Sequence, residues 1–429
     1  MGAAGSVVSC SSDDSATDRE ATPQVRNTFG VYSPGNLDEV PASAAQKMID
    51  TLGVDSYGAF EDFSIEQMRE MGITWVRLDF WYNGTSFVEP ADYVAKLRAA
   101  GFEVVACARP QYENIPTDLA RFQSDLRDLV QRYPWIKLWQ LGNEPNISMA
   151  NPDDFPGFFL AGSQVVRETC PDCRILLAAV ATRNFSTEQA RAVYRHALAT
   201  IASQENGKRS FDVFDLHFYG FAGSQGELQA NILEYQRLLA ENGFGTDIEI
   251  WLTETATHTG QPVTPPDAPR QTEDQQAAEL VRRFTTALGS GLARVSWARP
   301  YENYRYSNVE NGFYDNAGLI FSGLGPEADQ GIKAGTKKKA WYAYKTLIAK
   351  VSGYQEVSNL APGIYVFGFG ADHPPVYVVW DSGAGIILDQ TLPEKDRGEV
   401  MVTDVSGKET RSDTASILPD TMPLFVEPR

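Results

Sequence analysis

The feature that most constrains this chain is a regular alternation of two kinds of segment between residue 27 and about residue 351. Short apolar runs are each followed by a stretch with apolar residues at three- and four-residue spacing, which is typical of an amphipathic helix. We predict strands at 28–33, 73–80, 102–108, 136–141, 174–180, 212–217, 247–253 and 293–298. We predict helices near 64–71, 90–100, 116–133, 155–169, 187–204, 226–242, 272–289 and 338–351.

Strand then helix, repeated through one continuous region, predicts an α/β fold of the (β/α)8 TIM barrel type. A doubly wound open sheet uses the same alternation and is the structural alternative. It would normally carry a glycine-rich phosphate turn after the first strand, and residues 30–35 do not have that pattern. The barrel is therefore favoured.

After residue 353 the pattern changes to short runs of period two, at 364–368, 376–380, 385–388, 399–403 and 424–426. This alternation predicts a small C-terminal antiparallel β-domain. We divide the chain into a disordered tail or lipoprotein-like tether (1–26), a catalytic barrel (27–353) and a β-sandwich-like accessory domain (354–429). The accessory domain is either a carbohydrate-binding module or a cover for apolar barrel surface, and we favour the cover.

Polar and aromatic residues follow the predicted barrel strands at their carboxyl ends. Barrel enzymes carry their chemistry at this end, where the loops gather. The residues are Arg77, Asp79, Trp81, Arg109, Asn143, Glu144, Asp215, His217, Tyr219, Glu254, Trp297 and Arg299.

Two of these residues are glutamates that the barrel would bring together. Glu144 lies in the segment Trp139–Asn146 (WQLGNEPN), where Pro145 is expected to hold it in extended geometry at the strand end. Glu254 follows the seventh strand, across the barrel mouth from the fourth. Two carboxylates about 5–5.5 Å apart hydrolyse a glycoside with retention, and a gap of roughly 6.5–9.5 Å gives inversion. The sequence alone does not measure this gap.

The order of these motifs resembles the signature of clan A retaining glycoside hydrolases. Asn143-Glu144-Pro145 follows strand four and Thr253-Glu254 follows strand seven, while Arg77, His217-Phe218-Tyr219 and Trp297 match the accessory positions. Asn-Glu-Pro-Asn with a small C-terminal β-domain is most similar to glycoside hydrolase family 39. The resemblance covers the barrel, about residues 27–351.

The resemblance implies a role for each catalytic position. Glu144 is the expected general acid/base and Glu254 the nucleophile of a double displacement. Arg77 is expected to keep Glu254 ionised, and Tyr219 to donate a hydrogen bond to it. Each role has a plainer alternative: Glu144 caps a turn, Glu254 belongs to a structural salt bridge, or Arg77 is a simple ion-pair partner.

Three further residues are implied to bind or orient substrate. Asn143 is expected to bind the sugar 2-hydroxyl, and His217 to orient the acid/base or a sugar hydroxyl. Trp297 is expected to form the floor of the subsite for the cleaved sugar. A core role remains an alternative for His217 and for Trp297. The long loops at about 34–62 and 299–337, the second rich in Tyr and Phe, are expected to form walls around the substrate.

Charge and cysteine content limit the partners and the compartment. A net charge of −19 argues against nucleic acid, an anionic lipid or a polyanionic substrate as partner. The resemblance implies an oligo- or polysaccharide substrate. His196, His258 and His373 have no ligand spacing, so we predict neither a metal site nor a cofactor. We read the Cys170-Cys173 segment (CPDC) as a local disulfide, in preference to half a zinc site or a redox site.

The first residues give the only indication of targeting. Ser6 to Cys10, followed by a polar stretch, resembles a bacterial lipoprotein junction, although the preceding residues are too few for a full signal peptide. A myristoylation pattern at Gly2 carries less weight. No stretch has the roughly 20 apolar residues of a membrane span. We therefore expect an exported protein, with any membrane contact made through a lipid anchor at Cys10, and cytoplasmic residence as the alternative.

The sequence thus predicts a retaining O-glycoside hydrolase. A non-catalytic carbohydrate-binding protein on the same scaffold is the first alternative, which the presence of both glutamates disfavours. A transglycosylase would use the same residues and remains open.

Overall fold

The computed structural model describes residues 27–33, 57–110, 116, 118–149, 151–181, 187–302, 311–326, 328–371, 373–383, 385 and 387–429. Within them, parallel strands close into a barrel in the order β1-β9-β8-β7-β6-β5-β4-β2, and β1 pairs with β2 to complete the ring. The strands are β1 (Phe29–Tyr32), β2 (Trp75–Tyr82), β4 (Glu103–Pro110), β5 (Leu138–Leu141), β6 (Arg174–Leu177), β7 (Val213–Tyr219), β8 (Glu249–Ala256) and β9 (Arg294–Ala298). The predicted barrel is confirmed, and the open sheet is wrong.

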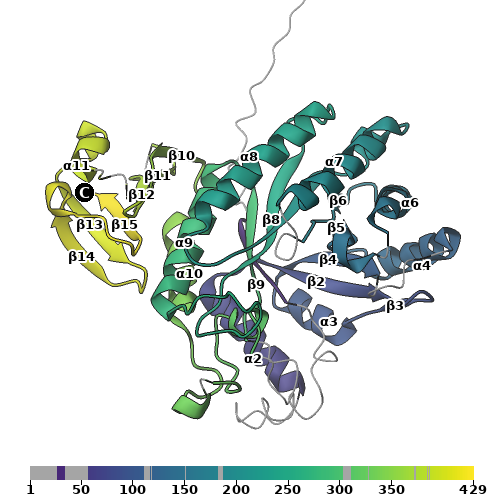
Figure 1. Cartoon of the computed structure of the whole chain (residues 1–429), viewed down its shortest axis with the longest axis horizontal. Helices are drawn as coiled ribbons and strands as arrows, with labels where there is room; N and C mark the ends of the chain where they lie inside the picture. The colour runs from purple at the N-terminus through teal and green to yellow at the C-terminus, as the bar shows by residue number, and fades with distance from the viewer. Residues whose placement is uncertain are drawn as a thin grey trace, which may run out of the picture.

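The helices lie around the outside of this barrel (Figure 1). They are α2 (Tyr57–Met71), α3 (Ala91–Ala99), α4 (Leu119–Arg132), α6 (Phe155–Thr169), α7 (Thr187–Ser203), α8 (Gln225–Glu241), α9 (Glu273–Gly289) and α10 (Lys339–Val351). Each predicted helix is present, with α2 beginning seven residues earlier than expected. The start of α9 shows the local logic, since Thr272 and Gln275 form a capping box that satisfies exposed backbone N–H groups.

The inside of the barrel is divided into an apolar floor and a polar layer above it. The floor is one buried cluster near the starts of the strands: Trp75, Val105, Leu138, Leu176, Val213 and Trp251. Side chains two residues apart on a strand face the same side. The next inward positions are therefore Arg77, Cys107, Gln140, Asp215 and Thr253, each fully buried. The polar layer thus lies on the side of the floor towards the carboxyl ends of the strands.

The C-terminal residues form one antiparallel sheet beside α9 and α10 (Figure 1). Its strand order is β10 (Glu356–Ala361), β11 (Ile364–Gly368), β12 (Val376–Val379), β15 (Leu424–Pro428), β13 (Glu399–Asp404) and β14 (Glu409–Asp413). The expected β-domain is confirmed, but its sandwich-like form is wrong, because the described residues give a single sheet. β10 and β14 were not predicted because they are largely polar and exposed. The strand predicted at 385–388 is also wrong at its described end, since Leu388 begins the short helix α11 (Leu388–Thr391).

Both faces of this sheet carry buried apolar side chains, and each face packs against a different part of the chain. Tyr365, Phe367 and Val378 belong to the same buried cluster as the barrel helices. Alternate residues such as Tyr377 and Val379 form a second cluster, which Leu388 of α11 covers. The period-two alternation therefore serves two interfaces, one against the barrel and one against α11.

Cys170 and Cys173 form a disulfide between the end of α6 and the start of β6. The predicted local disulfide is confirmed, and it removes both thiolates that a zinc site would need. In the described part of the chain, no helix combines the length and the apolar character that crossing a bilayer requires.

Candidate active site

Glu144 lies directly after β5, in a turn that its own backbone helps to close. Its φ of 43° and ψ of 58° are left-handed rather than extended, so the geometry expected from Pro145 is wrong. The backbone N–H of Glu144 donates to Ala179 O at 2.9 Å, and its carbonyl accepts from the N–H of Ser148 at 2.9 Å. These bonds offset the roughly 1–3 kcal/mol cost of this backbone conformation. The strain fixes where the carboxyl group of Glu144 emerges.

Glu254 lies near the end of β8, where a bulge changes its direction. Leu216 of β7 pairs with Leu252, but His217 pairs with Glu254, so Thr253 is an extra residue on this strand. A bulge rotates the following side chain relative to regular alternation. Thr253 and Glu254 therefore both take part in the polar interior of the barrel, although they are adjacent in sequence.

Arg77 connects the two glutamate-bearing strands. Its Nη1 donates to Glu254 Oε1 at 2.7 Å, its Nη2 to Asn143 Oδ1 at 2.6 Å, and its Nε to Gln140 Oε1 at 2.5 Å. Tyr219 donates from its hydroxyl to the other oxygen of Glu254. Burial raises the pKa of Tyr219 well above its usual range, and the charge of Glu254 adds to this effect. Tyr219 is therefore a hydrogen-bond donor at any working pH.

His217 faces Glu144 from β7. Its Nδ1 lies 2.9 Å from Glu144 Oε1, and its Nε2 lies 3.3 Å from Thr253 Oγ1. Burial alone would lower the pKa of His217, but the charges of Glu254, Asp215 and Glu144 outweigh it and raise the pKa to about 10. The imidazole is therefore protonated at neutral pH.

One side-chain atom from each of Glu144, His217 and Glu254 lies within 4.8 Å of the others. The oxygens of the two glutamates thus approach each other across the mouth of the barrel. Three such groups could hold a metal ion. Arg77 already supplies a positive charge beside Glu254, which disfavours a second cation there.

The predicted residues divide into one cluster and one outlier. Arg77, Asn143, Glu144, His217, Tyr219 and Glu254 are joined by the contacts above. Trp297 is fully buried, lies edge-on to Phe284 of α9 at 6.1 Å, and donates from Nε1 to Ala317 O at 2.9 Å. These contacts favour core packing, the alternative given for it, over a subsite floor.

Other aromatic residues border the cluster. Tyr314 lies edge-on to Tyr219 at 5.0 Å. Arg109 lies 4.0 Å above the ring of Trp81, and its Nη1 is 3.2 Å from Asp79 Oδ2. Of the two predicted substrate walls, the first lies outside the described residues over 34–56, and the second is described except at 303–310 and 327.

Sequence reasoning missed Gln140, which joins the cluster from below. The signal for it was present, since Leu138 and Gln140 are two residues apart and therefore face the same side of β5. A single glutamine in an apolar strand does not indicate a site by itself, because its partners Arg77 and Asp215 lie on other strands.

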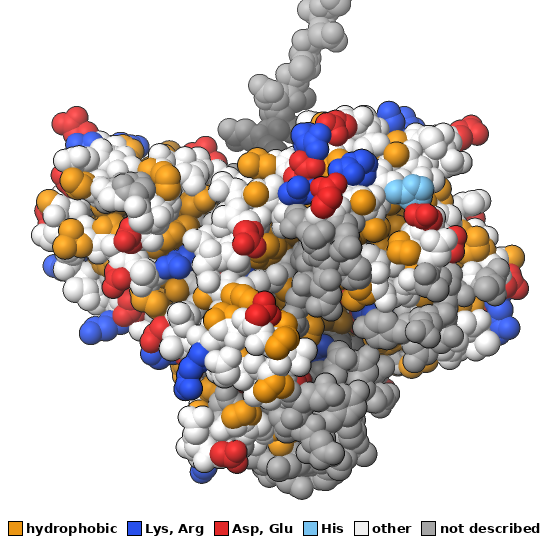
Figure 2. All heavy atoms as spheres, viewed as in Figure 1, with side chains coloured by type: hydrophobic (Ala, Val, Ile, Leu, Met, Phe, Trp, Pro, Cys, Tyr) orange, Lys and Arg blue, Asp and Glu red, His pale blue; other side chains and the backbone are white. Residues whose placement is uncertain are grey.

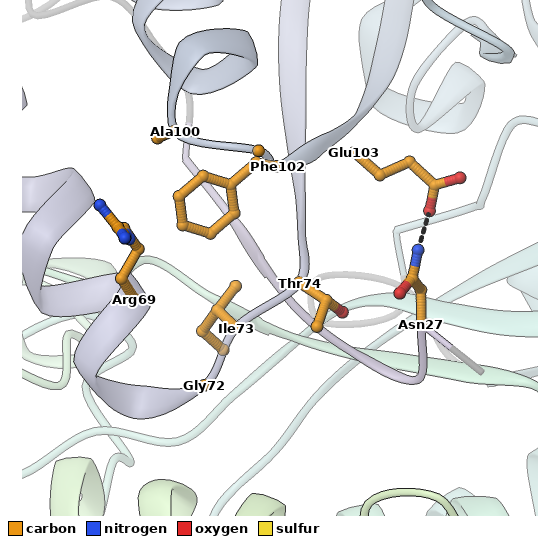
Figure 3. A pocket seen from close by; sticks show the side chains of 9 residues that line it. Asn27, Arg69, Gly72, Ile73, Thr74, Ala100, Phe102 and Glu103 are labelled. Atoms are coloured by element: carbon orange, nitrogen blue, oxygen red, sulfur yellow. Dashed lines mark hydrogen bonds between the residues drawn. The ribbon is translucent and has the colours of Figure 1, made fainter. Parts of the chain in front are cut away.

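Pockets in the described residues also lie away from this cluster, and one of about 1000 Å3 is lined by charged side chains that include Glu168, Lys208 and Asp247. A pocket of about 400 Å3 lies at the opposite end of the barrel, where Asn27 donates to Glu103 at 3.2 Å and Arg69, Ile73 and Phe102 line the walls (Figure 3). Conserved chemistry in barrels sits at the other end. On the face in Figure 2, acidic and basic side chains are interspersed over the described surface.

The sequence matches none of the protein-family models and none of the curated proteins with which it was compared. In structure, it is similar to a family 39 glycoside hydrolase from Bacteroides cellulosilyticus WH2, with a TM-score of 0.63 and 17% identity over 96% of this chain and 82% of that one. It is also similar to a glucosidase from Croceicoccus marinus (TM-score 0.62, 14% identity, 94% and 96% covered). A family 51 α-L-arabinofuranosidase from Bifidobacterium longum gives a TM-score of 0.55 at 12% identity, with 95% and 98% covered.

The chain therefore has the fold of glycoside hydrolases. The resemblance to clan A and to family 39 is confirmed in the fold alone, since these neighbours are 17%, 14% and 12% identical to the chain.

Proposed function

We propose that this protein is a retaining O-glycoside hydrolase that cleaves an oligo- or polysaccharide by double displacement. The observation that carries the proposal is the approach of Glu144 and Glu254, whose oxygens lie within 4.8 Å of each other. A gap of about 5–5.5 Å between carboxyl groups leaves no room for a water between sugar and base, and so favours direct attack by one carboxylate.

Glu254 is the nucleophile in this proposal. Arg77 and Tyr219 both donate to it, which favours its ionised form and aims its oxygens at the anomeric carbon. Bond formation between Glu254 and that carbon breaks the glycosidic bond, and the leaving oxygen takes its proton from Glu144. Water then attacks the glycosyl–enzyme ester and returns a proton to Glu144.

Asn143 supports the same step from the acid/base side. Its Oδ1 accepts from Arg77 Nη2, so its amide nitrogen is oriented as a donor for a sugar hydroxyl. A hydrogen bond to the 2-hydroxyl strengthens as the oxocarbenium-like transition state forms. This contact would therefore raise kcat as well as affinity.

The test is a pair of variants with different expected defects. Glu254→Ala should lose hydrolysis of every aryl glycoside by several orders of magnitude, and added azide should restore turnover with an inverted glycosyl azide as product. Glu144→Ala should lose activity on substrates with poor leaving groups and retain cleavage of dinitrophenyl glycosides, which need no proton. Near-normal turnover by either variant removes that residue from its role.

Assays of the same purified protein also distinguish the two alternative functions. A non-catalytic carbohydrate-binding protein would bind oligosaccharides without hydrolysing any member of a panel of aryl glycosides and polysaccharides. A transglycosylase would give longer oligosaccharides as its main products in the presence of an acceptor sugar.

We also propose that the protein is exported. The Cys170–Cys173 disulfide supports this, because disulfides persist in oxidising compartments and are rare in the cytosol. Cys10, the expected lipid anchor, lies outside the described residues. Cell fractionation with palmitate labelling tests both points, and a wholly cytosolic, unlabelled protein would contradict them.

A further inference from the structure

A buried hydrogen-bonded group lies directly beneath the two glutamates. Its centre is Asp215 on β7, which is fully buried. Its Oδ2 accepts from Gln140 Nε2 at 2.6 Å and from Thr253 Oγ1 at 2.6 Å, and its Oδ1 accepts from the backbone N–H of Thr253 at 3.2 Å. Leaving a buried carboxylate without partners is costly, and these three hydrogen bonds offset that cost for Asp215.

The first consequence concerns the nucleophile. A glutamine amide has a donor end and an acceptor end, and the carboxylate of Asp215 accepts only. Gln140 must therefore turn Nε2 towards Asp215, which leaves Oε1 facing Arg77 Nε at 2.5 Å. Arg77 then has Nη1 directed at Glu254. Asp215 thus decides which end of Gln140 meets Arg77.

The second consequence concerns the acid/base. The hydroxyl proton of Thr253 is given to Asp215, so Thr253 Oγ1 offers a lone pair to His217 Nε2 at 3.3 Å. The same nitrogen lies 3.6 Å from Asp215 Oδ2 and 3.5 Å from Glu254 Oε1. Because these atoms are acceptors, Nε2 carries a hydrogen. The remaining proton of the ring is shared between Nδ1 and Glu144 Oε1, which are 2.9 Å apart.

We propose that Asp215 is the positioning residue that sets both the aim of Arg77 at Glu254, by orienting Gln140, and the proton shared by His217 and Glu144, by its own charge 3.6 Å from His217 Nε2. The proposal rests on the function given above and goes beyond it, since Asp215 touches neither substrate nor reacting atoms. In this proposal a single residue influences both the nucleophile side of the site (Glu254 with Arg77) and the acid/base side (Glu144 with His217).

Among the described residues, the charged groups that lie close to His217 come from β5, β7 and β8. They are Glu144 after β5, Asp215 on β7 itself and Glu254 on β8. Arg77 from β2 lies on the far side of Glu254 and donates to the oxygen that also faces His217. Replacing Asp215 by Asn removes one of three negative neighbours and leaves the other two in place.

The first experiment does not depend on catalysis. The chain has four histidines, so ring 15N NMR of the free protein resolves them, and His217→Gln identifies the resonance. In the wild type we expect the His217 ring to stay protonated to about pH 9, and in Asp215→Asn to titrate about one pH unit lower or more. An unchanged titration would overturn the proposal.

Thr253→Val is the matched control, because it removes the hydroxyl and keeps the charge of Asp215. We expect the His217 titration in this variant to stay within about half a unit of wild type. A shift as large as that of Asp215→Asn would assign the effect to the hydroxyl and overturn the role of the carboxylate.

The second experiment measures the pH dependence of kcat/KM on an aryl glycoside. Asp215→Asn should move the basic limb to lower pH and also lower kcat/KM at its pH optimum. Gln140→Leu keeps the charge of Asp215, so it should lower kcat/KM at the optimum and leave both the basic limb and the NMR titration of His217 unchanged. A folded Gln140→Leu variant with wild-type kcat/KM would overturn the role of Asp215 in aiming Arg77, even where Asp215→Asn does not fold.

The two proposals fail in different ways. A wild-type protein without activity on any glycoside would refute the proposed function, while the NMR titration would still decide the role of Asp215. Active wild type with an unaltered His217 titration in Asp215→Asn would refute the positioning role alone.

Discussion

Replacing Arg77 by Lys tests the link between the two halves of the site most directly. Arg77 donates to Glu254, Asn143 and Gln140 from three different nitrogens, with distances of 2.7, 2.6 and 2.5 Å. Lysine keeps the positive charge but presents it as a single point, so it can retain the bond to Glu254 and not the other two.

The size of the effect follows from those two bonds. A hydrogen bond to a charged group contributes about 1.5–3 kcal/mol, so two of them amount to about 3–6 kcal/mol. Each 1.36 kcal/mol of lost transition-state stabilisation lowers the rate tenfold. We therefore expect kcat/KM to fall by about 10²- to 10⁴-fold, with most of the change in kcat.

The assay is steady-state hydrolysis of the best aryl glycoside, with circular dichroism to show that the variant is folded. Arg127→Lys is the matched control, because Arg127 forms an exposed pair with Glu168 and lies on α4, outside the barrel. It should leave kcat/KM unchanged. A folded Arg77→Lys enzyme that keeps a third or more of wild-type kcat/KM would refute the assigned role of Arg77.

Three further predictions concern buried groups. The pKa of His217 is raised to about 10, so its stabilising contribution should be complete below about pH 6.5 and lost as the pH rises through 10. The difference in urea unfolding free energy between wild type and His217→Asn should therefore shrink over this pH range. A difference that stays constant with pH would contradict the prediction. Burial raises the pKa of the Cys107 thiol to about 12, so native protein should resist alkylation there at pH 8 and unfolded protein should not, as mass spectrometry of its peptide will show. A Cβ at Gly30 would overlap the ring of Trp75, so Gly30→Ala should destabilise by about 1–3 kcal/mol, whereas Gly157→Ala in open space on α6 should not lower the melting temperature.

The barrel was predictable because its signal is periodic and repeated. Buried strands appear in the sequence as apolar runs, and amphipathic helices as apolar residues at three- and four-residue spacing. Each predicted barrel strand is present in the structure. The C-terminal strands β10 and β14 were missed because their side chains are mostly polar, so neither carries the alternation by which strands are recognised.

The site was predictable where residue type and strand position agreed. Glutamates at the ends of strands four and seven could be paired from the barrel topology alone. The left-handed backbone of Glu144 and the bulge at Thr253 depend on contacts with neighbouring strands, such as Glu144 N–H to Ala179 O. Gln140 and the role of Asp215 likewise become visible only when side chains from several strands are placed together.

Trp297 shows what strand position alone leaves open. A tryptophan after the last barrel strand fits the pattern of a subsite floor, but the direction of its side chain depends on register. In the structure its ring lies edge-on to Phe284 of α9, and its indole N–H donates to Ala317 O. Sequence position gave its place on the strand and not the side that it faces.

The stereochemistry of the product tests the central claim most directly. Proton NMR of the first minutes of hydrolysis identifies the anomer that is released before mutarotation. Attack by Glu254 followed by attack of water inverts the anomeric centre twice, so we expect the first product to have the configuration of the substrate. A first product of the opposite configuration would mean that water attacks directly, and it would contradict the assignment of Glu254 as nucleophile and Glu144 as acid/base of a double displacement.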